Sequence, residues 1–106
     1  MDKLFGSKVR TDTLVALARL GSAYVSEIAG VIGRRPIEVQ RALASLELSG
    51  AVQTRRVGTI RTAELNRRFP EYERLLDLLL EIGGRPDYAS MWKAVRRRPR
   101  AIGKAR

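Results

Sequence analysis

The sequence predicts a small α+β domain that is mainly helical, with one β-hairpin and additional helices at its C-terminal end. Three observations support this prediction. Helical hydrophobic patterns in residues 8–49 end at glycines, an alternation of period two follows in residues 52–65, and a leucine-rich helical pattern comes after it. The chain has 106 residues, which suits a single domain.

The first two helices are predicted over residues 8–20 and 25–32, where apolar side chains recur at spacings of three and four. Ser7 is a suitable N-cap, because its hydroxyl can accept a hydrogen bond from a backbone N–H of the first turn. Gly21 and Gly33 directly follow the two helices. We expect the helices to end there, since glycine tolerates the left-handed conformation that ends a helix.

A third helix is predicted to start near Pro36 and to end near Ser49. Proline suits the first helical turn, where its missing N–H has no intrahelical partner to lose. The apolar stripe that should face the core consists of Val39, Leu43 and Leu46. The opposite side of this helix is therefore expected to face solvent.

The hydrophobic period then changes to two. Residues 52–57 and 59–65 are predicted to be strands joined by a tight turn at Gly58. A fourth helix is predicted over residues 70–82, and a last helical stretch over residues 87–97. The leucines of the fourth helix cover more than one face, so part of them should pack on the first helix and the hairpin.

The net charge of +10 favours a polyanionic partner, with nucleic acid first and an anionic membrane second. The charge is uneven. Residues 34–68 carry eight basic and three acidic groups, and residues 93–106 carry seven basic groups and no acidic group. We divide the chain into a unit expected to bind nucleic acid (residues 1–68, the winged helix-turn-helix DNA-binding domain of the resemblance given below), C-terminal helices expected to dimerise (69–97) and a basic flexible tail (98–106).

Several functions are disfavoured by what the sequence lacks. It has no cysteine and no histidine, which removes disulfides, thiolate and imidazole metal sites and the commonest general base. No glycine-rich phosphate loop opens a helix, and no serine or threonine has an evident base. We expect no enzymatic activity, no cofactor and no metal. Without a signal peptide or an apolar run long enough for a bilayer, the expected location is the cytoplasm, away from membranes.

The order helix, helix, turn, helix, hairpin is that of the winged helix-turn-helix fold. The sequence resembles ArsR-like and MarR-like winged-helix regulators over residues 8 to about 66. The resemblance rests on Val25-Ser26-Glu27-Ile28-Ala29, Gly33, Val39-Gln40-Arg41-Ala42-Leu43, Leu46 and Gly50-Ala51-Val52. It implies a transcriptional regulator, such as a repressor, that binds double-stranded DNA. Because ArsR-like metal sensors bind their metals through cysteine and histidine, the resemblance does not imply metal sensing here.

A recognition helix over about residues 35–49 is expected to enter the major groove. The candidate base contacts are Arg35, Gln40 and Arg41, since arginine can bind guanine bidentately and glutamine can bind adenine. Arg34 is a candidate phosphate contact. Glu38 could accept a hydrogen bond from cytosine, or it could repel phosphate and pair with Arg34 or Arg41.

The hairpin, residues 52–65, would be the wing that contacts the DNA backbone or the minor groove. Its candidate residues are Arg55, Arg56 and Arg61. The arginines at the C-terminal end, Arg96, Arg97 and Arg98, could form an arm along the phosphates. They could instead solubilise the chain or anchor it to an acidic partner.

The leucine-rich fourth helix predicts a homodimer, which would place two recognition helices about one DNA turn apart on an inverted repeat. The candidate interface residues are Leu75, Leu76, Leu79, Ile82 and Trp92. Trp92 and Tyr88 could instead cap the monomer core.

A second hypothesis is a protein-docking module whose basic tail binds nucleic acid without sequence preference. The opening Leu4-Phe5-Gly6-Ser7-Lys8-Val9-Arg10 resembles winged-helix proteins found beside or fused to small nucleotidyltransferase domains. A nucleotidyltransferase-like protein is therefore the partner that this hypothesis favours. Selective binding of DNA by residues 1–92 would argue against it.

Overall fold

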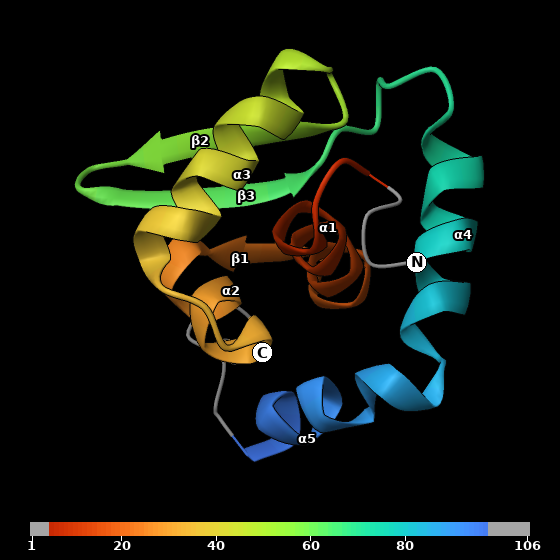
Figure 1. Ribbon diagram of the computed structural model, residues 1–106. Coiled ribbons are helices and arrows are strands. Elements are labelled where there is room, and N and C mark those ends of the chain that lie inside the picture. The colour runs from red at the N-terminus through yellow and green to blue at the C-terminus, as the bar shows by residue number, and fades with distance from the viewer. Residues whose placement is uncertain (1–4, 98–106) are drawn as a thin grey trace.

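Residues 5–97 of the protein are described in a computed structural model, shown as a ribbon in Figure 1. The elements follow the order α1 (Lys8–Leu20), β1 (Ser22–Tyr24), α2 (Val25–Ile32), α3 (Pro36–Leu48), β2 (Val52–Val57), β3 (Ile60–Leu65), α4 (Tyr72–Gly83), the short 3-10 helix η1 (Pro86–Tyr88) and α5 (Ala89–Arg97). This order confirms the predicted α+β class and the additional C-terminal helices.

The first two helices have the predicted bounds, and their ends have the predicted chemistry. The hydroxyl of Ser7 accepts a hydrogen bond of 3.2 Å from the backbone N–H of Arg10 at the start of α1. Gly21 and Gly33 follow α1 and α2 with φ angles of 85° and 73°, in the region that glycine adopts without strain. The predicted last helix is divided, because residues 86–88 form a 3-10 turn before α5 begins.

The sheet has three strands in the order β1-β3-β2, all antiparallel, so the prediction of a hairpin alone was incomplete. The additional strand, β1, has only three residues, too few for a recognisable alternation. Its pairing is set by β3, where Ala63 lies directly opposite Ala23. Both alanines are buried, so β1 connects the sheet to the core beneath it.

Helix α1 lies at the centre of the molecule, with α2 and α3 to one side and α4 on the other (Figure 1). Its Leu14 and Leu17 are buried and share one apolar cluster with Ile28 of α2 and Val39 of α3. The predicted inward stripe of α3 is confirmed, since Val39, Leu43 and Leu46 are all buried. The opposite face of α3 is consequently held toward solvent.

The C-terminal helices complete this core rather than standing apart from it. Leu79 and Ile82 of α4 are fully buried against the rest of the chain. The indole of Trp92 is buried too, and its Nε1–H donates a hydrogen bond of 2.6 Å to the carbonyl of Gly83. These three apolar residues, Leu79, Ile82 and Trp92, therefore offer no surface to a second copy, and their assignment to a dimer interface is corrected. Trp92 and Tyr88 instead lie in the monomer core, as the alternative prediction has them.

Candidate nucleic-acid interface

The outer face of α3 presents the three residues proposed to contact bases. Arg35, Gln40 and Arg41 are all exposed. Arg35 precedes the helix in an extended conformation, and Pro36 occupies its first position. The sequence therefore predicted this exposed face from the inward stripe alone.

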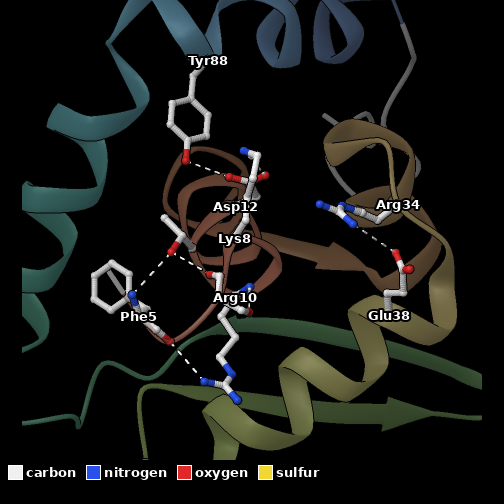
Figure 2. Close-up of polar contacts among 9 residues, drawn as sticks. Phe5, Lys8, Arg10, Asp12, Arg34, Glu38 and Tyr88 are labelled. Carbon is white, nitrogen blue, oxygen red and sulfur yellow. Dashed lines mark hydrogen bonds and ion pairs between the residues drawn. The ribbon is translucent and has the colours of Figure 1, made fainter. Parts of the chain in front are cut away.

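Glu38 organises the start of α3. Its carboxylate accepts a hydrogen bond of 3.4 Å from the backbone N–H of Arg35, one of the N–H groups near the helix start. The same carboxylate lies 3.9 Å from the Arg34 guanidinium, which Figure 2 shows, and 3.6 Å from that of Arg35. Of the alternatives for Glu38, pairing with Arg34 is what the structure has, and Arg35 is a second partner. Such surface ion pairs are weak, so phosphate or a base can displace them.

The wing arginines fall on two faces of the hairpin. Arg56 lies directly opposite Arg61 in the β2–β3 register, so their side chains share one face. Arg55 is on the other face, where its guanidinium lies 3.9 Å from Glu64. Like charges opposite one another on a sheet destabilise it unless an anion lies nearby. From the sequence alone these three arginines form one group, because the sequence does not give the register of the strands.

A chain of hydrogen bonds connects the wing to α3. The backbone N–H and the hydroxyl of Thr54 in β2 donate to the carboxylate of Glu47 at 3.3 and 3.1 Å. The Thr54 hydroxyl oxygen in turn accepts a bond of 3.4 Å from the guanidinium of Arg61 in β3. Arg61 is thus oriented through the same helix that carries the candidate base contacts. Glu47 and Thr54 cannot be found from the sequence, because their contact depends on how α3 crosses the hairpin.

A groove of about 570 Å³ lies between the start of α3, the wing tip and the start of α2. It is lined by Tyr24, Val25, Ser26, Pro36, Gln40, Thr59, Ile60 and Arg61. Gln40 and Arg61, predicted from separate elements, therefore face one common hollow. Helix α3 lies across the hairpin on this side of the molecule, as Figure 1 shows.

The remaining candidates belong to the C-terminal end. Arg96 and Arg97 are the last residues of α5, and Arg98 lies outside the described residues. Within residues 5–97, no group of three or more acidic, histidine or cysteine residues is arranged to hold a metal ion. None of the helices in that range is both long enough and apolar enough to cross a membrane.

Solved structures share this fold. The crystal structure of AntR, an antimony-specific transcriptional repressor, is 28% identical with a TM-score of 0.62, over 76% of this chain and 70% of AntR. YusO from Bacillus subtilis is 19% identical with a TM-score of 0.58, over 86% of this chain and 59% of YusO. Lactococcus lactis ZitR is 16% identical with a TM-score of 0.54, over 86% of this chain and 70% of ZitR. No protein-family model and no curated protein matches the chain.

A helix-turn-helix with an exposed third helix and a basic hairpin beside it defines a winged helix-turn-helix protein. The likeness to AntR, a transcriptional repressor, confirms the resemblance to winged-helix regulators that the sequence predicted.

Proposed function

We propose that this protein binds a specific duplex DNA sequence as a homodimer and represses transcription there. Helix α3 would lie in the major groove, with Arg35, Gln40 and Arg41 against base edges. The wing would lie along the adjacent backbone or minor groove. The likeness to a transcriptional repressor supports the repressing role.

One observation supports this proposal above the others. Gln40 on α3 and Arg61 on the wing line the same groove. A major groove about 12 Å wide admits one helix, and the phosphates at its edge are then within reach of a flanking hairpin. The two residue types match this geometry, because glutamine can bind adenine and arginine can bind phosphate.

Electrostatics supports the wing contact independently. Arg56 and Arg61 lie opposite one another, both exposed, at a position where two like charges repel. A phosphate between the two guanidinium groups would replace that repulsion with two charge-assisted hydrogen bonds. Arg55 has a direct acidic neighbour, Glu64, on the other face, whereas Glu47 reaches Arg61 only through Thr54. We therefore assign the phosphate contact to Arg56 and Arg61.

The homodimer is proposed through the surface of α4 that the monomer leaves uncovered. Leu78 and Leu80 are exposed, and Leu75 and Leu76 beside them are only half-buried. Leu78 and Leu80 lie about 160° apart around the helix, on opposite flanks of the face that Leu79 buries, so a second copy would cover one flank, either Leu78 with Leu75 or Leu80 with Leu76. A two-fold dimer through α4 would present two copies of α3 to an inverted repeat.

Selection of bound fragments from a random duplex library, at physiological salt, tests the proposal. Enrichment of an inverted repeat with half-sites about ten base pairs apart is expected. The matched comparison is the chain truncated after residue 97, which keeps α5 whole and lacks the four basic groups of residues 98–106. If truncation abolishes binding and the full chain enriches no motif, the docking-module hypothesis replaces this one.

A further inference from the structure

The outermost line of α3 is more apolar than a helix face in water requires. Ile37, at the second position of the helix, is 44% exposed. Leu48, on the last turn, is 91% exposed. Between them lie Arg41 and Ala44, both exposed as well. Along the chain, each of these four residues follows the previous one by four, three and four positions. They therefore form one line along the helix, opposite the buried stripe.

Ile37 is placed where a recognition helix contacts bases. The N-terminal residues of such a helix approach the base edges in the major groove. Ile37 lies one turn before Arg41, about 6 Å along the helix axis, which corresponds to roughly two base-pair steps. Leu48 lies about 16 Å further along the helix than Ile37, near its C-terminal end. The two exposed aliphatic residues therefore occupy different places relative to the DNA.

Thymine is the base whose major-groove edge an aliphatic side chain suits. Thymine alone presents a methyl group there, whereas the edges of the other three bases offer mainly hydrogen-bonding atoms. An isoleucine against any other base edge would bury polar atoms without a hydrogen bond, which is unfavourable. Contact with a methyl group instead removes apolar surface of both partners from water.

We propose that Ile37 is a specificity-determining residue that contacts the 5-methyl group of a thymine, within two base pairs of the base contacted by Arg41. The inference rests on the proposed DNA-binding function and adds a base preference to it. The preference for thymine would come from a hydrophobic contact. Substitution of Arg35, Gln40 or Arg41 should therefore leave that preference unchanged.

The test uses the full chain and the duplex that it selects. Each thymine of the site is replaced in turn by deoxyuridine, which lacks only the methyl group. For the unmodified protein, one such replacement should weaken binding about fourfold, the effect of one buried methylene-sized group. The position bound by Arg41 is located separately, as the one at which Arg41→Ala relaxes base preference.

Ile37→Ala should weaken binding to the thymine site and abolish the penalty for deoxyuridine at that one position. Leu48→Ala is the matched control, since it shortens an exposed aliphatic side chain on the same line and should retain the penalty. A selected site without any deoxyuridine penalty, or a penalty that persists unchanged in Ile37→Ala, overturns the inference and leaves the proposed function intact. If the unmodified chain selects no motif at all, the proposed function itself fails and this inference fails with it.

Discussion

The phenol of Tyr88 donates a hydrogen bond of 2.7 Å to the carboxylate of Asp12, across 76 positions of the chain. Both residues are buried, and the second carboxylate oxygen of Asp12 lies 3.0 Å from the ammonium group of Lys8 (Figure 2). This bond attaches η1 to the middle of α1. Because α1 also supports α2 and α3, the C-terminal elements and the winged helix-turn-helix form one core.

Tyr88→Phe should destabilise the protein by about 1–3 kcal/mol, because it leaves one oxygen of a buried carboxylate without its donor. Thermal or urea unfolding monitored by circular dichroism measures the change. Lys8→Met is the matched comparison on the same carboxylate. The Lys8 side chain is 48% exposed, so its loss should matter less. A larger effect of Lys8→Met than of Tyr88→Phe would contradict this ranking.

Gly83→Ala should also destabilise the fold. A Cβ atom at this position would lie 3.0 Å from the Trp92 ring and 3.1 Å from Val15, both inside the core. Overpacking of this kind costs about 1–3 kcal/mol. Gly84→Ala is the control, because its Cβ would meet only backbone oxygens at 3.5 Å or more. The free energies of unfolding of the two variants should differ clearly, and equal values would show that the core adapts at Gly83.

The helices were predictable because local rules specify them. The inward stripe of α3 places Gln40 and Arg41 outside once Val39 and Leu43 are placed inside, so the candidate base contacts follow from periodicity alone. The glycine after α2 likewise marks its end, with Gly33 in the left-handed region. In these elements neighbouring residues suffice to determine the structure.

Long-range contacts were not predictable in this way. The strand β1 exists because β3 pairs with it, and neither of their sequences indicates the partner. The leucine-rich pattern of α4 indicated excess apolar surface without telling which leucines the monomer covers. The structure buries Leu79 and leaves Leu78 and Leu80 exposed. The same reason explains why Arg55 was grouped with the arginines of the opposite face of the wing.

The proposed dimer predicts that Leu78→Glu combined with Leu80→Glu yields a monomer. Leu78 and Leu80 are 37% and 46% exposed, so circular dichroism first checks that the double variant is folded, and the loss of apolar surface should then leave it monomeric. Sedimentation equilibrium gives the mass directly. Ser90→Glu, which adds negative charge at an exposed residue outside α4, is the control for charge. A variant that remains dimeric would place the interface elsewhere.

Arg41→Ala and the wing variants should affect DNA binding in different ways. Arg41→Ala should lose about 1–3 kcal/mol on the selected site and relax base preference at one position. Arg56→Ala and Arg61→Ala should weaken binding to all sequences and each lower the salt dependence by about one phosphate contact. Arg55→Ala, on the other face of the hairpin, is the control. Titrations at several salt concentrations separate these behaviours, and an unaltered salt slope for Arg61→Ala would exclude its phosphate contact.

The hydrogen bonds from Glu47 through Thr54 to Arg61 predict a positioning effect on DNA binding. Thr54→Val keeps the shape of the side chain and removes its hydroxyl, so Arg61 should lose its orientation and affinity should fall about two- to tenfold. Thr54→Ser retains the hydroxyl and should bind nearly as tightly as the unmodified protein. A double-mutant cycle with Arg61→Ala distinguishes positioning from a general loss of stability. If Thr54 acts through Arg61, Thr54→Val has no further effect once the guanidinium is absent, whereas additive losses indicate an independent role.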